Sequence, residues 1–329
     1  MMHGGNVWQG NDPAAWLDFS ANLRPEGAPD WVRQIMTSAL PLTRYYPDRT
    51  LAQASRGIAA YAHVPESCVL PTAGGIAAIG LVCAISQGRV LTAPPTFGGY
   101  DEAAAAYGKK TGFYTAPCDL RPDDLRFLCN PNNPTGEVLS KEQVLREWAL
   151  CRANDATLAA DEAFIDYCPE NSVRAEAASR ENLVVVGSLT KSLCIPGVRL
   201  GYIIAREETI AMAKKRQLCW PLNSLAMAIA AELPAHLDEL ETDRRTNAVR
   251  REAFAHELRA LGADVAPSQS NFLLARFDRP MALAADRLKA AHILVRRCDS
   301  FGLEDCFLRL AVKTEHENKR LLEALKGCL

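Results

Sequence analysis

Residues 183–202 read LVVVGSLTKSLCIPGVRLGY, and this stretch decides the fold. The apolar run 183–186 is typical of a buried strand, so Lys191 stands on a loop just beyond that strand, among hydroxyl side chains. Arg199 follows eight residues later. A lysine in such a setting is suited to Schiff-base formation. A lysine after a strand is nevertheless usually a solvated loop residue, so other segments have to decide.

Three further segments combine a short strand with polar or glycine-rich residues at its end. The strand 157–160 ends on Asp161, which the sequence alone would explain as a cap of the next helix. The strand 125–129 runs into NPNNPTG at 130–136, a tight loop by composition. The strand 68–70 leads through Gly74 and Gly75 into an alanine-rich helix, whose unpaired amides would attract an anion. The combination is far more specific than any one segment.

Together these segments resemble the cofactor motifs of fold-type I pyridoxal-phosphate enzymes, the class I and II aminotransferase family, over nearly the whole chain. The resemblance implies pyridoxal 5'-phosphate as the cofactor and Lys191 as its Schiff-base lysine. It makes Asp161 the anion at the ring nitrogen, where a protonated pyridinium withdraws electrons from the substrate. It also implies that Asn133 donates a hydrogen bond to the phenolic oxygen of the ring.

The resemblance further predicts how the phosphate and the ring of the cofactor are held. Phe97 matches the residue that stacks on the ring, although an ordinary core aromatic is the simpler interpretation without that match. Tyr46 matches a tyrosine that reaches the phosphate of the neighbouring subunit, which predicts a homodimer. Relatives often carry polar residues at two positions of the phosphate turn, so backbone amides must serve there. The expected phosphate site comprises Gly74, Gly75, Ile76, Ser188, Thr190 and Arg199.

The order of apolar and amphipathic segments predicts the architecture. From about residue 51 to 217, strands alternate with helices, the pattern of a mainly parallel sheet covered by helices. The candidate cofactor residues then lie at the carboxyl ends of strands, where ligands bind such sheets. We expect an N-terminal segment (1–44) that joins the small domain and the active site, a large cofactor-binding domain (45–224) and a small α+β domain (225–329).

The substrate is expected to carry two anionic groups. Arg309 lies on the apolar strand 307–312, where burial would be costly without a paired anion, and it matches the carboxylate-binding arginine of the family. Asn133 would help to hold that carboxylate. A substrate phosphate would meet His3, Asn22 and Arg296. The roles of Arg24 and Lys313, where relatives usually differ, stay open.

Two reactions are compatible with these residues. The nearest branch of the family holds histidinol-phosphate aminotransferases and threonine-phosphate decarboxylases. The strings HGGN at 3–6 and LDFSAN at 17–22, and WPLNSLA at 220–226, resemble the decarboxylases, and Phe164 replaces a tyrosine common in the aminotransferases. His3 could equally belong to a disordered terminus. The resemblance favours decarboxylation of O-phospho-L-threonine to aminopropanol phosphate, a step of cobalamin biosynthesis, over transamination.

Composition points to a small-molecule enzyme. The 329 residues are 48% hydrophobic with a net charge of −2 and no basic run, which argues against nucleic acid or a membrane surface as partner. Eleven cysteines without a Cys-x-x-Cys pair or an apolar signal region predict reduced thiols in the cytoplasm and no metal site. A silent cofactor-sensing module, the alternative to an enzyme, would need a helix-turn-helix domain or a basic face that the sequence lacks.

Overall fold

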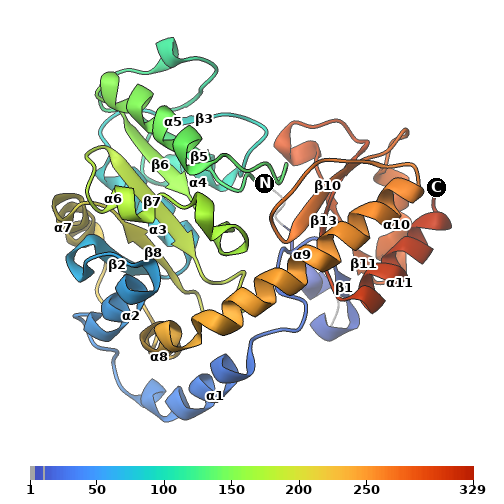
Figure 1. Ribbon diagram of the computed structural model, residues 1–329, viewed down its shortest axis with the longest axis horizontal. Coiled ribbons are helices and arrows are strands. Elements are labelled where there is room, and N and C mark those ends of the chain that lie inside the picture. The colour runs from blue at the N-terminus through green and yellow to red at the C-terminus, as the bar shows by residue number, and fades with distance from the viewer. Residues whose placement is uncertain (1–3, 10–11) are drawn as a thin grey trace.

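The structure is a computed structural model that describes residues 4–9 and 12–329 and has two lobes (Figure 1). The larger lobe is built on a seven-stranded sheet with the order β2-β8-β7-β6-β5-β3-β4. Its strands are β2 (Val69–Thr72), β3 (Val90–Thr92), β4 (Thr111–Phe113), β5 (Leu125–Cys129), β6 (Thr157–Asp161), β7 (Leu183–Ser188) and β8 (Gly201–Ile204). The predicted large sheet covered by helices is confirmed.

One strand departs from the parallel arrangement. β8 pairs antiparallel with both β7 and β2, whereas the other pairs in the sheet are parallel. A parallel return would need a crossover, usually a helix. Residues 189–200 form turns instead, including the loop of Lys191, so the chain reverses direction and β8 lies beside β7.

Helices cover both faces of this sheet. In β7 the side chains alternate: Leu183 and Val185 belong to one buried cluster, and Val184 and Val186 to another. The first cluster includes residues of α2 (Ala52–Ala62), α5 (Lys141–Ala153) and α8 (Ser224–Glu232), and the second those of α3 (Gly75–Ile85), α4 (Gly99–Ala106) and α7 (Glu207–Arg216). A strand buried on both faces explains the continuous apolar run at 183–186.

The smaller lobe contains a four-stranded antiparallel sheet with the order β12-β13-β10-β9. The strands are β9 (Asp264–Val265), β10 (Phe272–Arg276), β12 (Arg296–Arg297) and β13 (Phe307–Ala311), and the helices are α10 (Ala282–Ala290) and α11 (Glu315–Lys326). Residues 293–297 are divided between two sheets: β12 pairs with β13, whereas β11 (Ile293–Leu294) pairs in parallel with β1 (Leu17–Asp18). The N-terminal segment therefore adds to the small lobe.

A long helix connects the lobes. The 24-residue α9 (Leu237–Ala260) runs diagonally from α8 to the small lobe in Figure 1. α1 (Asp30–Ala39), at the bottom of that view, packs on α8, which also packs on α2 of the large lobe. The predicted domain boundary at residues 224 and 225 stays a prediction.

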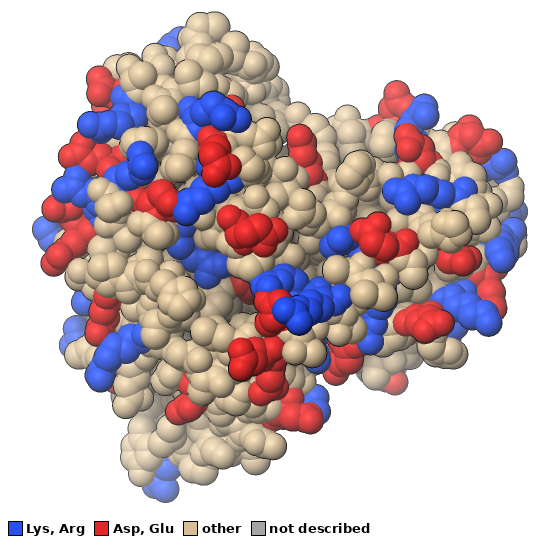
Figure 2. Space-filling view, in the orientation of Figure 1, with Lys and Arg blue, Asp and Glu red and all other residues tan. Residues whose placement is uncertain are grey.

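The surface in Figure 2 carries acidic and basic side chains interspersed, without a broad patch of one sign. In the described part of the chain, no helix combines the length and apolar character that crossing a membrane requires. No group of three or more His, Cys, Asp or Glu residues among the same residues is arranged to hold a metal ion.

Candidate active site

The predicted site residues converge on one pocket of about 330 Å³, at the carboxyl ends of β5, β6 and β7 and beside the small lobe. Three predicted residues are not among those lining it: Gly74 is the N-cap of α3, Tyr46 lies elsewhere on the surface, and His3 falls outside the described residues. The predicted residues that line the pocket are Asn22, Gly75, Ile76, Phe97, Asn133, Asp161, Ser188, Thr190, Lys191, Arg199, Arg296 and Arg309.

Lys191 lies three residues beyond β7, on the loop before β8. Desolvation lowers the pKa of its amine to about 8, and the charges of Arg309 and Arg199 act in the same direction, against the opposing effect of Asp161. A substantial fraction of this amine is therefore uncharged near neutral pH, as a nucleophile that attacks an aldehyde requires.

Asp161 is a buried carboxylate at the end of β6. Its Oδ2 accepts a hydrogen bond from the Tyr100 hydroxyl (2.6 Å) and its Oδ1 one from the backbone N–H of Ala163 (3.0 Å). Burial raises the pKa of this carboxyl group, and these bonds and the charge of Lys191 oppose the increase. A cationic ring nitrogen would supply the remaining stabilisation of a buried carboxylate.

Tyr100 is a partner of Asp161 that sequence reasoning missed. The ring is fully buried and stacks on Phe127, with 4.5 Å between ring centroids. It also meets Phe97 edge-on at 5.4 Å. Its position, second in a helix after a glycine pair, is indistinguishable in a single sequence from that of any core aromatic residue. The position of α4, which packs on α3 and β3, brings the Tyr100 hydroxyl to the carboxylate.

A cradle for a phosphate forms where α3 begins. Gly74 has a φ of +79°, and a Cβ atom there would lie 2.7 Å from the Arg199 guanidinium. A Cβ on Gly75 would lie 3.1 Å from that of Ser188, whose hydroxyl is 2.8 Å from the Thr190 hydroxyl. Free helix amides, two hydroxyl groups and a guanidinium thus surround a space kept open by glycine, which suits a phosphate ester.

Arg309 extends from β13 into the pocket and is buried. Its Nη1 donates to Asn133 Oδ1 (2.5 Å) and its Nη2 to the carbonyl oxygen of Ser20. Its Nε is buried without a hydrogen-bond partner among the described residues. Burial lowers the pKa of this guanidinium to about 10, and the charge of Arg296 adds to the decrease. The guanidinium stays charged at neutral pH, and the groups around it balance its positive charge only in part.

Arg296 is the cross-strand partner of Arg309, since the two residues pair directly across β12 and β13. Its Nη2 donates to Ser300 Oγ (2.6 Å), and both guanidinium groups lie over the Phe301 ring, at 5.0 Å for Arg296 and 5.9 Å for Arg309. Like charges directly opposite on neighbouring strands are destabilising. This end of the pocket is therefore suited to binding anions.

The two N-terminal strings meet at the same end of the pocket. The N–H of Gly5 donates to Ser20 Oγ (2.8 Å), and a Cβ on Gly4 would lie 2.1 Å from the Ser20 carbonyl oxygen. Asn22 is buried beside them, and no described residue provides a partner for its Oδ1. Gly4 and residues 20–22 thus complete the pocket wall next to Arg309, and Gly5 fastens them together.

Tyr46 lies in an exposed apolar patch outside the pocket. Its side chain is 81% exposed and stacks on Trp220, with 4.6 Å between ring centroids. Such a patch on a protein surface commonly marks an interface. The exposed members of the patch are Leu40, Leu42, Tyr45, Tyr46, Leu218 and Trp220.

A half-buried lysine facing a buried carboxylate, beside a phosphate cradle on this sheet, defines the class of pyridoxal-phosphate-dependent enzymes. The chain belongs to the family described as aminotransferase class I and II, whose sequence pattern matches residues 15–325. It is accordingly a pyridoxal-phosphate-dependent enzyme of that family.

Similar proteins include two with different activities. A threonine-phosphate decarboxylase of Salmonella typhimurium is 32% identical over 99% of this chain and 96% of its own length. A histidinol-phosphate aminotransferase of Symbiobacterium thermophilum is 34% identical, over 95% and 90% respectively. The crystal structure of the histidinol-phosphate aminotransferase from Clostridium acetobutylicum superposes with a TM-score of 0.87 at 27% identity, covering 95% of this chain and 98% of that one. Similarity alone does not separate the two reactions.

The lowered pKa of Lys191 predicts how the cofactor-free protein recaptures pyridoxal phosphate. The rate of Schiff-base formation, followed by absorbance, should rise with pH and level off above about 8, because the uncharged amine reacts. Borohydride reduction and peptide mapping should place the pyridoxyl label on Lys191. A label on another lysine, or a midpoint near the ordinary lysine value, would contradict the assignment.

Proposed function

We propose that this protein decarboxylates O-phospho-L-threonine to aminopropanol phosphate, a reaction of cobalamin biosynthesis. The observation that carries the proposal is the meeting of Gly4, Gly5 and Ser20–Asn22 beside Arg309 at the anionic end of the pocket. These are the residues whose sequence resembles the decarboxylases. Histidinol-phosphate transamination is the second candidate, favoured by the relative at 34% identity.

We assign the cofactor contacts to the residues that the pocket brings together. Lys191 binds the cofactor covalently, Asp161 pairs with its ring nitrogen, Phe97 stacks on the ring and Asn133 donates to the phenolic oxygen. Once bound, the cofactor draws electron density from the substrate Cα. Its phosphate is assigned to the backbone amides of Gly75 and Ile76 and to the side chains of Ser188, Thr190, Arg199 and the partner's Tyr46. The N–H of Gly74 donates to the Thr72 carbonyl (2.8 Å), so Gly74 serves by keeping the space open.

The substrate's two anions are assigned to the two facing arginines. Residues paired directly across antiparallel strands have Cα atoms roughly 4.5–5.5 Å apart, a spacing that suits a carboxylate and a phosphate on adjacent carbons. Arg309, with Asn133, takes the α-carboxylate, and Arg296, with Asn22 and His3, takes the phosphate. Histidinol phosphate has no carboxylate, so its own binding would leave one arginine without an anion.

The reaction depends on which bond at Cα the residues hold perpendicular to the ring. If Arg309 and Asn133 hold the carboxylate perpendicular, carbon dioxide leaves and Lys191 can deliver a proton to Cα. In transamination Lys191 would instead remove the Cα proton. Phe164, buried against Phe272 at 5.1 Å, offers no hydroxyl group to the pocket wall.

The reaction itself is testable with three substrates. O-phospho-L-threonine should release carbon dioxide and form aminopropanol phosphate, with little conversion of the cofactor to pyridoxamine phosphate. O-phospho-L-serine in the same assay measures what the methyl group contributes. Histidinol phosphate with 2-oxoglutarate is the competing test: rapid glutamate formation there, without carbon dioxide from either phosphoamino acid, would make the protein an aminotransferase.

The different roles assigned to the two arginines predict different binding losses when each is replaced. Arg309→Ala should weaken binding of any amino acid, whereas Arg296→Ala should selectively weaken phosphorylated ones, by about 2–5 kcal/mol for loss of a buried charge pair. Binding can be followed by the cofactor absorbance during titration. Arg297→Ala, at an exposed ion pair on the same strand, is the matched control. Equal losses for phosphorylated and unphosphorylated ligands in Arg296→Ala would refute the assignment of roles.

If Tyr46 serves the partner's site, the enzyme is an obligate homodimer. Tyr46→Phe and Lys191→Ala subunits, each nearly inactive, should regain activity when mixed, because a mixed dimer contains one complete site. Lys191→Ala mixed with Asp161→Asn is the control, since both residues belong to one subunit's pocket and no complete site can form. A fully active monomer in analytical ultracentrifugation would refute this arrangement.

A further inference from the structure

Residues 20–27, here called the strap, connect the small lobe to the Lys191 loop. At one end the Ser20 carbonyl accepts from Arg309, and in the middle Asn22 lines the pocket. Next along the strap, the backbone N–H of Arg24 donates to the Lys191 carbonyl (3.3 Å). The strap ends in a turn closed by the Gly27 N–H on the Arg24 carbonyl (3.4 Å). The strap therefore contacts Arg309 and Lys191, the residues proposed to bind the substrate carboxylate and the cofactor.

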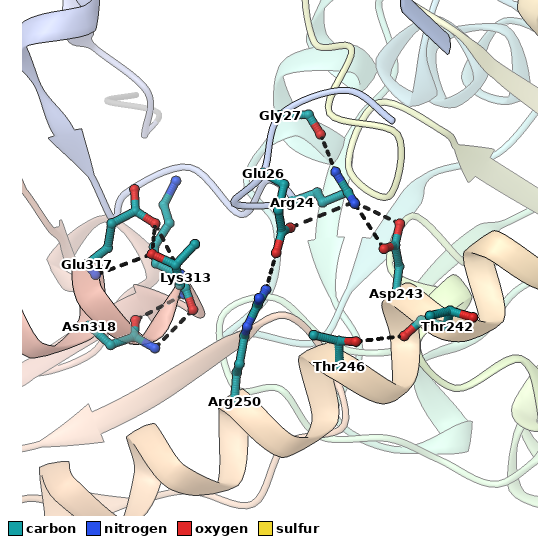
Figure 3. Close-up of polar contacts among 11 residues, drawn as sticks. Arg24, Glu26, Gly27, Thr242, Asp243, Thr246, Arg250, Lys313, Glu317 and Asn318 are labelled. Carbon is teal, nitrogen blue, oxygen red and sulfur yellow. Dashed lines mark hydrogen bonds and ion pairs between the residues drawn. The ribbon is translucent and has the colours of Figure 1, made fainter. Parts of the chain in front are cut away.

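Two ion pairs fasten the strap to α9 (Figure 3). Arg24 forms a two-point pair with Asp243, Nε to Oδ2 at 2.7 Å and Nη2 to Oδ1 at 3.0 Å, and its Nη1 donates to the Gly27 carbonyl (2.9 Å). Glu26 accepts from Arg250 and also lies 3.8 Å from Arg24. The pairs thus form one continuous network.

The charge order fixes the register of the strap. Asp243 and Arg250 are seven residues apart on α9, two turns, and so share a face. Along the strap the positive Arg24 precedes the negative Glu26, whereas along α9 the negative Asp243 precedes the positive Arg250. A strap shifted along α9 would therefore bring like charges together. Burial is the largest single influence on the pKa of Glu26 and would raise it. The hydrogen bond from Arg250, a backbone hydrogen bond and the charges of Arg250 and Arg24 together outweigh burial and hold the pKa below its ordinary value. The pair is charged at neutral pH.

Arg24 is accordingly unavailable as a direct ligand of the substrate phosphate. Its side chain is 17% exposed and committed to Asp243 and Gly27, and it is absent from the described residues that line the pocket. A two-point arginine–carboxylate pair fixes direction as well as distance. The Arg24 side chain instead restrains the strap backbone, which carries Ser20 and Asn22.

We propose that Arg24 is a positioning residue: its pairing with Asp243, supported by Glu26 and Arg250, locks the strap so that Ser20 and Asn22 complete the substrate pocket. The proposal rests on the proposed roles of Arg309 and Asn22 in binding, but it holds for either reaction. Loss of the pair should loosen the strap, so that substrate binding has to reorder it. Binding should then weaken more than the chemical step slows.

The test uses the cofactor-loaded enzyme and two readouts. In Arg24→Ala and in Asp243→Asn, amide hydrogen exchange across residues 19–27 should quicken, and KM for the amino acid that the wild type turns over should rise about tenfold, or about 1.4 kcal/mol. kcat should change less, and the cofactor absorbance should stay that of the intact Schiff base. The double variant Arg24→Asp with Asp243→Arg should bring the exchange rate and KM part of the way back to their wild-type values. Arg24→Lys should lie closer to the wild type still.

The control is Arg245→Ala, which removes an exposed ion pair with Glu241 on the same helix and should alter neither readout. Unchanged exchange in Arg24→Ala, or faster exchange without a rise in KM, would overturn the proposal. A failure of the proposed reaction appears differently. The wild type would then transaminate instead of decarboxylating, and the strap would be tested with that substrate.

Discussion

Uncompensated positive charge is the constraint on which this active site depends. Four basic side chains line one pocket, Lys191, Arg199, Arg296 and Arg309, against the two carboxylates of Asp161 and Glu102. Burying such charges is costly unless anions meet them. Some of the cost is relieved internally, since Lys191 can lose its proton and Arg296 and Arg309 lie over aromatic rings. The part of the cost that is not relieved favours the binding of ligands with several negative charges, and such ligands should stabilise the folded protein.

The fold meets this constraint by bringing rigid backbone from different places to one edge of the sheet. β6 and β7 deliver Asp161 and Lys191, the start of α3 delivers free amides, and β13 delivers Arg309 from the other lobe. The antiparallel return of β8 is part of the same arrangement. It brings Gly201 against the backbone of Gly74 and Gly75, where a Cβ would lie 2.5 Å from the Gly74 carbonyl carbon, and so holds the phosphate turn in place.

The large sheet was predictable because strands buried on both faces appear as apolar runs. The positions of Asn133, Asp161 and Lys191 in the pocket were predictable because each follows such a run. Features that depend on packing between segments far apart in the chain were not predictable. The hydroxyl of Tyr100 on Asp161 depends on how α4 packs on α3 and β3. The break between β11 and β12 follows from β1 joining from the far end of the chain. Arg24 was left without a role because its partner, Asp243, lies 219 residues away.

The contact between Gly4 and Ser20 has a practical consequence for anyone producing this enzyme. Gly4 forms part of the pocket wall, and its backbone approaches the Ser20 carbonyl too closely for any other residue. A purification tag joined ahead of Met1 is therefore attached within a few residues of the pocket wall, and a polyhistidine sequence there would bring its own cations. The carboxyl end follows α11 on the small lobe, so a fusion at that end leaves the pocket wall unaltered.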